Sequence, residues 1–335
     1  MLGTAGHFQS YALIECPAPW AGNAFASPQI PANLKAAFAE IARAKISIRP
    51  LLIRGDDEAA PARTKVLIYR SREGLTRGFT GLEQDLPGLE AVASLAKGYV
   101  SGTGTGLVPA TAKRDLLVCT HASNDKCCGA FGYPFYLETL GTLASLGLSG
   151  VRAWQSSHLG GHRFAPTLLD FPQGRCYGGL DRASLVSILT RTGDIGVFER
   201  CYRGSARLPN PVQILERELI LRHGWEFLDY QVSGKVLAHD PAKRQSRVEI
   251  SVQKPDGSQG RYEAEVVVDE KKTVYLTGDC HAGSAAGPTA RIDKLFQPFF
   301  RFVEDSMTAG KEPFIEVLAV FRHETGYRPS GGGAS

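Results

Sequence analysis

The stretch RDLLVCTHASNDKCCG, residues 114–129, decides both the fold and the chemistry expected of this chain. Its first six residues, RDLLVC, predict a strand in which the apolar residues Leu116, Leu117 and Val118 lead to Cys119 at the end. The remainder is a polar loop that closes on the adjacent pair Cys127 and Cys128. The chain has seven cysteines, scattered apart from this pair, so the loop indicates metal or redox chemistry rather than a disulfide framework.

A second stretch, SSHLGGHRF at residues 156–164, carries two histidines on either side of Leu-Gly-Gly. The strand VRAWQSS leads into it, and the segment GAFGYPFYLETLGTLASLG between the two stretches predicts a helix. A strand, helix and strand of this length predict a right-handed crossover between parallel strands. Both ligand-bearing loops should therefore leave the same edge of the sheet, and the two glycines favour a tight loop over a helical turn.

Four side chains of these loops can close one site: Cys119, Cys128, His158 and His162. Two thiolates and two imidazoles suffice for a tetrahedral zinc ion, or for a binuclear iron–sulfur cluster in which histidine replaces cysteine on one iron. Eight residues separate the two cysteines, whereas a common zinc knuckle separates them by only about two to four. On the residues alone, Cys127 and Cys128 are nearly equal candidates for the second thiol ligand beside Cys119.

Other interpretations of these loops stay open at the level of the residues. His121 would duplicate a histidine that the second loop already supplies, so we expect it beside the ligands or on the surface. The pair Cys127 and Cys128 allows a thiol redox protein. A zinc-stabilised or metal-free module that binds a partner is the third interpretation.

Taken together, the motifs C-x8-C, D-x-C-C-G, S-S-H-x-G-G-H-R-F-A and P-x-G-x-x-Y-G resemble the sucrase/ferredoxin-like family of thioredoxin-like ferredoxins. The resemblance covers at least residues 113–192, and the CPAPW region is similar to the family's degenerate N-terminal domain. It implies a [2Fe-2S] cluster whose ligands are Cys119, Cys128, His158 and His162. No carboxylate pair in a glycosidase context accounts for the word sucrase.

The residues before the ligand loops predict a first unit with the element order β-α-β-β-α. The predicted elements are strands at 11–16, 46–54 and 64–70 and helices at 33–44 and 89–99. This is the order of a small thioredoxin-like unit without the active C-x-x-C, and Cys16 is expected to be a buried structural thiol.

The residues after the ligand loops predict a hairpin turned at 172–174 and a helix capped by Asp181. The segments FERCYRG and PNPVQILERELILRHG predict helices. Predicted strands follow in YQVSGKVLAH, SRVEISVQ, YEAEVVV, TVYLTGDC and IEVLAVFRHE. The cluster DCH at 279–281 is expected to be a loop without chemistry.

The expected fold class is α/β, or α+β overall, with two thioredoxin-like domains of which the second binds the cluster. The predicted domains are 1–110, 111–195 and a helical connector with a β-rich region at 196–328, followed by a flexible tail at 329–335. Hydrophobic residues make up 43% of the 335 residues and charged residues 21%, which is typical of a globular protein.

The predicted function is one-electron transfer by an electron carrier or redox subunit rather than by a stand-alone enzyme. A net charge of +4 without a basic run disfavours nucleic acid, and the absence of a long apolar run or signal-like N-terminus predicts a cytoplasmic protein without a membrane span. Lys126, Arg163 and Arg175 near the loops predict a positive rim for an acidic redox partner, a ferredoxin or a reductase. Histidine ligands also predict a reduction potential that falls as the pH rises.

Overall fold

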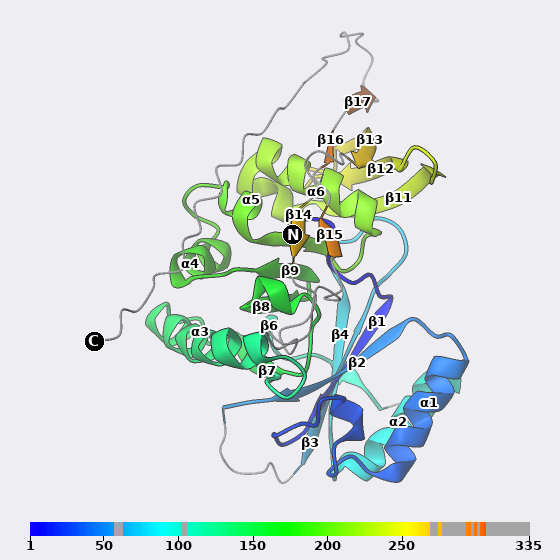
Figure 1. Cartoon of the computed structure of the whole chain (residues 1–335), viewed down its shortest axis with the longest axis vertical. Coiled ribbons are helices and arrows are strands. Elements are labelled where there is room, and N and C mark those ends of the chain that lie inside the picture. The colour runs from blue at the N-terminus through cyan, green and yellow to red at the C-terminus, as the bar shows by residue number, and fades with distance from the viewer. Residues whose placement is uncertain are drawn as a thin grey trace.

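The computed structural model describes residues 1–56, 63–101 and 106–268, together with four short strands at 274–276, 293–295, 298–299 and 302–305. Its main feature is a sheet of ten strands with the order β10-β9-β8-β6-β7-β2-β1-β3-β4-β5, in which β5 is the short strand Val108–Pro109. Helices flank this sheet, and a separate antiparallel sheet follows it in the chain (Figure 1). The protein is therefore a mixed α/β structure, as the sequence predicts.

The first half of the main sheet has the element order β-α-β-β-β-α, which contains one strand more than the predicted β-α-β-β-α. Its elements are β1 (Ser10–Glu15), α1 (Ala32–Arg43), β2 (Ile48–Arg54), β3 (Thr64–Arg70), β4 (Thr80–Leu86) and α2 (Leu89–Ser101). Strand β1 pairs with β2 in parallel and with β3 antiparallel, and β4 pairs with β3. The predicted strands and helices are confirmed, whereas β4 was not predicted because its sequence, TGLEQDL, mixes glycine and acidic residues.

The second half repeats this topology. Its elements are β6 (Arg114–Cys119), α3 (Tyr133–Ser145), β7 (Val151–Ser156), β8 (Thr167–Phe171), β9 (Arg175–Gly178) and α4 (Arg182–Thr190). Strand β6 pairs with β7 in parallel and with β8 antiparallel, so the order β7-β6-β8-β9 matches β2-β1-β3-β4. The predicted parallel pair, the hairpin and the Asp181 cap, which accepts from the Ser184 N–H, are confirmed.

The two halves join through a short antiparallel contact between β2 and β7, which pairs only Ile53 with Ser156 and Arg54 with Gln155. The ring of Tyr69 on β3 nevertheless stacks on that of Phe171 on β8, with centroids 4.0 Å apart. Strands in a sheet lie about 4.8 Å apart, so residues five strands apart touch only if the sheet folds back at this junction. The two halves thus enclose a shared core, while the predicted boundary near residue 110 stays a prediction.

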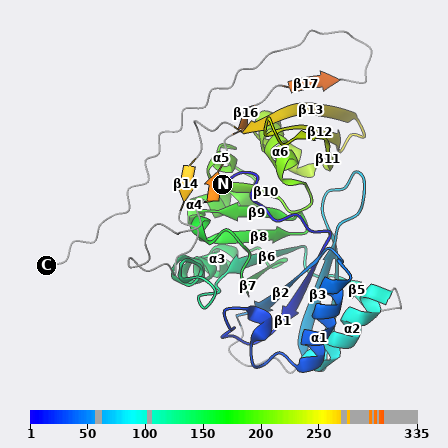
Figure 2. The ribbon, with the colours of Figure 1, turned by 45° about the vertical axis from the view of Figure 1, so that its right-hand side comes forward.

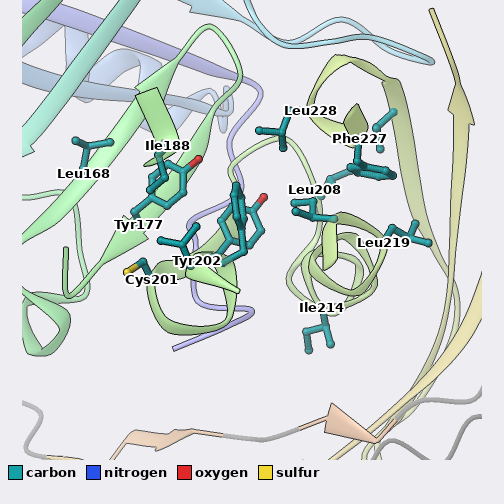
Figure 3. Packing of buried hydrophobic residues seen from close by; sticks show 14 of the residues in the cluster. Leu168, Tyr177, Ile188, Cys201, Tyr202, Leu208, Ile214, Leu219, Phe227 and Leu228 are labelled. Atoms are coloured by element: carbon teal, nitrogen blue, oxygen red, sulfur yellow. The ribbon is translucent and has the colours of Figure 1, made fainter. Parts of the chain in front are cut away.

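The C-terminal region packs against the second half. It contains α5 (Val197–Cys201), β10 (Tyr202–Ser205), α6 (Asn210–His223), β11 (Gln231–Asp240), β12 (Gln245–Gln253) and β13 (Gln259–Val268). Helix α6 contacts β10 on one side and β12 on the other, and Figure 2 shows it beneath the curved β11–β13 sheet. Figure 3 shows part of this core, in which Tyr177 and Tyr202 of the main sheet lie beside each other.

The helix predicted for FERCYRG is wrong from Tyr202 onward. The helix ends at Cys201 because the next four residues extend the main sheet by pairing with β9. In the segment TVYLTGDC the structure describes only β14 (Val274–Leu276), which pairs with β15 (Asp293–Leu295). The predicted strand IEVLAVFRHE and the cluster at 279–281 lie outside the described residues.

None of the helices in the described part of the chain combines the length and the apolar character that crossing a bilayer requires.

Candidate metal centre

The two ligand loops leave the same edge of the main sheet. Cys119 is the last residue of β6 and is in register with Ser156, the last residue of its parallel neighbour β7. The Thr120 N–H then donates to the carbonyl oxygen of Ser156, so the loops begin side by side. The convergence that the strand-helix-strand order predicts is therefore confirmed.

A short π-helical turn, η2 (Cys128–Gly132), returns the chain from the first loop to the end of β6. A β-carbon at Gly132 would overlap the carbonyl oxygen of Cys119, so only glycine permits this close approach of helix and strand. The approach is what brings Cys128, which begins the turn, back to Cys119. Both cysteines are 1% exposed and belong to the core between the two halves of the sheet.

Three of the four predicted ligands converge. The Nδ1 atom of His158 lies 3.6 Å from Sγ of Cys128 and 4.0 Å from Sγ of Cys119. All three donor atoms lie within 4.8 Å of one another, which is the grouping that a metal ion requires. Two soft sulfur ligands with an imidazole suit zinc and iron–sulfur clusters better than magnesium or calcium, which prefer oxygen.

A hydrogen bond couples the two thiols. The hydrogen bond from Cys128 holds the pKa of Cys119 well below its usual value, against the effect of burial, and His158 acts in the same direction. The same hydrogen bond raises the pKa of Cys128, and burial raises it further. Cys119 is thus prepared as a thiolate, and a bound metal would take the place of the remaining thiol proton.

His162 lies beside this group rather than within it. Its ring centroid is 6.1 Å from that of His158, and its Nδ1 atom lies 2.8 Å from Oδ2 of Asp125. Asp125 is itself buried, and its other carboxylate oxygen accepts the Cys127 N–H. A carboxylate on the outer nitrogen of a ligating histidine is a common arrangement, because it fixes the orientation of the ring.

Cys127 groups with Asp125 and His162, whereas Cys128 groups with Cys119 and His158. The fold thus favours Cys128 over Cys127 as the partner of Cys119. Cys128 is a free thiol, so the structure contains no bond between the two adjacent cysteines, which is the bond that a vicinal redox pair would form.

His121 is buried beside the centre and points away from the thiols. Its Nδ1 atom accepts the backbone N–H of His158 at 3.2 Å, and its Nε2 atom lies 2.8 Å from the carbonyl oxygen of Ala21. Both ring nitrogens are therefore occupied, and His121 supports the histidine loop instead of offering a ligand atom.

The N-terminal half contributes the wall of the first ligand loop. Ser123 Oγ donates to the carbonyl oxygen of Trp20 at 2.6 Å, and Asn124 Nδ2 donates to that of Gly22 at 2.9 Å. Cys16, next to this wall, is fully buried, and burial raises its pKa to about 11. It is the inert structural thiol that the sequence predicts.

An open groove of about 290 Å³ reaches the centre from solvent, between the wall and the histidine loop. Arg49, Asn124 and His158 are among its lining residues. Of the predicted positive rim, Lys126 is exposed, but Arg175 is only 6% exposed because it lies in β9 inside the sheet. The expectation that Arg175 forms part of a surface rim is wrong.

Sequence reasoning missed three residues around the loops. Asp125 stood within the D-x-C-C-G motif and could have been selected there, whereas Arg49 and Arg203 contact the histidine loop from distant strands and carry no local signal.

No curated protein and no solved structure matches the chain. The family model for sucrase/ferredoxin-like proteins matches residues 1–204, which is more than half of the 335 residues. That range includes the first half of the sheet, the two ligand loops and the first three residues of β10. The chain therefore belongs to the sucrase/ferredoxin-like family.

Proposed function

We propose that this protein transfers single electrons through a [2Fe-2S] cluster held by Cys119, Cys128, His158 and His162. The observation that carries the proposal is the convergence of two buried thiols and an imidazole at one sheet edge. The ferredoxin-like part of the family name points in the same direction.

Each proposed ligand has a distinct task. The cysteines would bind as thiolates, for which the lowered pKa of Cys119 prepares the site. The histidines would bind as neutral groups and leave the site less negative than four thiolates would. Such a cluster supplies one-electron chemistry at a potential of about −150 to +300 mV, well above plant-type ferredoxins.

The topology supports a thioredoxin-like origin for both halves of the sheet. Each half has a parallel pair of strands joined through a helix, an antiparallel hairpin and a closing helix, in the strand order 2-1-3-4. The first half would be a degenerate copy that serves as a wall for the ligand loop of the second.

Proton transfer would accompany electron transfer at His162. Asp125 lies against Nδ1 of His162, so the proton at that atom faces a buried carboxylate. Electron uptake favours proton retention, and the potential should fall as the pH rises. A redox titration from mildly acidic to alkaline pH tests this, with Asp125→Asn as the variant that weakens the hold on the proton.

The partner we propose is an acidic redox protein, a ferredoxin or a reductase, in the cytoplasm. Lys126 is exposed on the first ligand loop, and the groove beside His158 gives a partner access to the centre. The rate of association should fall as the salt concentration rises. Salt-independent kinetics with an acidic ferredoxin would contradict this.

The decisive experiment is metal and sulfide analysis of protein purified without oxygen, combined with electron paramagnetic resonance. Iron and acid-labile sulfide in equal amounts, a red-brown colour and a signal on reduction support the proposal. A colourless protein with stoichiometric zinc would instead support the zinc-stabilised partner-binding module.

A further inference from the structure

Two arginines from distant strands hold the loop between the histidines. Arg49 on β2 donates from Nη2 to the carbonyl oxygen of His158 at 2.9 Å. Arg203 on β10 donates from Nη1 to the carbonyl oxygen of Gly160, also at 2.9 Å. The carbonyl groups of His158 and Gly160 in the loop H-L-G-G-H thus each accept a hydrogen bond from a guanidinium group, one on β2 and one on β10.

Neither guanidinium pairs with a carboxylate among the described residues. The other hydrogen bonds of Arg203 go to the hydroxyl and the carbonyl oxygen of Thr4, at 3.1 and 2.8 Å. Arg49 lies over the ring of Phe8, with its guanidinium carbon 5.1 Å from the centroid. Every hydrogen bond described for the two arginines therefore ends on a neutral oxygen.

An uncompensated buried cation is costly, and Arg203 is only 4% exposed. Burial lowers the pKa of Arg203, and the nearby Arg49 and Arg163 act in the same direction. The groups that act to raise it are the thiols of Cys176 and Cys119. Since an arginine remains charged in any case, a negative charge on Cys119 would partly offset the charge of Arg203.

Gly161 makes room for the guanidinium group of Arg203. It has a φ of +75°, and a β-carbon there would lie 2.6 Å from Nη2 of Arg203. A β-carbon at Gly160 would lie 3.9 Å from Nη2 of Arg49, which is an ordinary contact distance, but the φ of +81° there favours glycine. Gly161 is therefore explained by Arg203 as well as by the turn, and Gly160 by the turn.

We propose that Arg49 and Arg203 form a clamp that positions His158 and His162 and opposes the negative charge that the centre gains on reduction. They are positioning residues, since they contact the loop and not the metal-binding atoms. The inference rests on the proposed function in one respect, namely that the centre takes up an electron. Each electron adds one negative charge beside two fixed positive charges, so the clamp favours the reduced state and raises the potential.

The test compares Arg203→Gln and Arg49→Gln, which remove the charge, with Arg203→Lys and Arg49→Lys, which keep it. The control is Arg207→Gln: Arg207 is a partly buried arginine that donates to the carbonyl oxygens of Thr76 and Val232, away from the histidine loop. For each variant, iron content, thermal stability and reduction potential are measured on the full chain.

Each glutamine variant of the clamp should make reduction at least tenfold less favourable, which is about 59 mV for a one-electron couple. The lysine variants should recover most of this shift, and Arg207→Gln should leave the potential unchanged. Arg49 is only partly buried, so its variants keep the test informative if those of Arg203 do not fold. Loaded glutamine variants with the wild-type potential, or an equal shift in Arg207→Gln, would overturn the proposal.

If the wild-type protein contains no redox-active iron, the proposed function fails, and the positioning role is then tested by titration with cobalt(II) alone. A clamp that orients His158 predicts at least tenfold weaker cobalt binding in both glutamine variants, with wild-type affinity in Arg207→Gln. Unchanged affinity in the clamp variants would refute the positioning role as well.

Discussion

The backbone N–H of His158 donates to Nδ1 of His121 at 3.2 Å, and this contact connects the proposed metal centre to the N-terminal half of the protein. Because Nδ1 accepts, the ring proton lies on Nε2, which donates to the carbonyl oxygen of Ala21. Burial lowers the pKa of His121, so the ring stays neutral at physiological pH. A single buried imidazole thereby links the wall at Ala21 to the loop that carries both proposed histidine ligands.

The first prediction concerns this link. His121→Ala should retain the metal but bind it about 10–100-fold more weakly, because the loop of His158 loses its support. Competition with a chelator measures the affinity. The control is His239→Ala, which removes a histidine of β11 that is hydrogen-bonded to Ser246 on β12. Complete loss of metal from His121→Ala, equal to that of His158→Ala, would show that His121 is itself a ligand.

The second prediction separates the adjacent cysteines. Cys119→Ser and Cys128→Ser should each abolish metal binding or leave it grossly unstable, since a hydroxyl is a poor substitute for a soft thiolate. Cys127→Ser should have a milder effect, because Cys127 groups with Asp125 and His162 instead. Metal analysis and visible absorption report the result. The assignment is off by one position if Cys127→Ser loses the centre while Cys128→Ser keeps it.

The fold was predictable from sequence where apolar residues mark a strand and its neighbours. The segments RDLLVC and VRAWQSS predict β6 and β7 in this way, and their order around one helix predicts the shared edge at which Cys119 and His158 meet. β4 was missed because only Glu83 and Leu86 of its seven residues are buried, and the charge of Glu83 is balanced by Arg152 on β7. The residues around Glu83 do not indicate that it is buried, because the arginine that pairs with its carboxylate lies 69 residues away in the sequence.

The residues proposed as ligands could be selected from the sequence, but their surroundings could not. The structure brings the donor atoms of Cys119, Cys128 and His158 within 4.8 Å of one another, and the assignment of all four residues as ligands stays a prediction. Arg49 contacts the histidine loop because β2 pairs with β7, and Arg203 contacts it from β10, which is distant in the sequence. Such contacts follow from tertiary packing, and the sequence around either arginine contains no motif that points to the loop.

The third prediction concerns Asp115, a fully buried carboxylate between the two halves of the sheet. It accepts from Arg152 Nε at 2.7 Å, from Trp154 Nε1 at 2.7 Å and from the Tyr69 hydroxyl. Asp115→Ala should lower the free energy of unfolding by about 3–5 kcal/mol, because the partly buried guanidinium of Arg152 and the buried indole of Trp154 lose their acceptor. Denaturant unfolding measures this.

A matched control for Asp115→Ala is Asp85→Ala, which breaks the exposed ion pair with Lys65. Surface pairs contribute only about 0–1 kcal/mol, so this variant should be nearly as stable as the wild type. Equal losses of unfolding free energy in the two variants would mean that the hydrogen bonds of Asp115 contribute no more than the exposed ion pair of Asp85 and Lys65.

The fourth prediction concerns the pH dependence of stability at Glu83. Burial acts to raise its pKa, but hydrogen bonds from Thr111 and Arg152 outweigh it and hold the pKa below the ordinary value of 4.5. A depressed carboxyl pKa stabilises the fold above the unfolded-state value, and that stability is lost as the pH falls through the folded-state value. Stability from Glu83 is therefore present at neutral pH and declines below pH 4.5.

Glu83→Gln should accordingly lower the free energy of unfolding by about 1.5–3 kcal/mol at pH 7, and the difference from the wild type should shrink as the pH falls below 4.5. Glu138→Gln, on the exposed face of α3, is the control for loss of a negative charge. A difference that is constant from pH 7 to pH 3 would rule out the proposed coupling to Arg152.

The last prediction concerns Gly161, which leaves room beside the histidine loop for the guanidinium group of Arg203. Gly161→Ala should lower the free energy of unfolding by about 1–2 kcal/mol from the left-handed backbone alone, at a φ of +75°. The added β-carbon also meets the guanidinium of Arg203, which cannot withdraw without breaking its bonds to Thr4 and Gly160. Metal affinity should therefore fall together with stability.

Gly141→Ala is the matched control, because Gly141 lies in α3 with no atom within 4 Å of an added β-carbon. Alanine favours a helix over glycine by about 0.5–1 kcal/mol, so this variant should be slightly more stable than the wild type and bind metal equally well. Unfolding curves and chelator competition on both variants separate the two outcomes. A Gly161→Ala protein with wild-type stability and metal affinity would show that Arg203 does not press on this loop, because the same methyl group would then be accommodated as easily at 161 as on an open helix face.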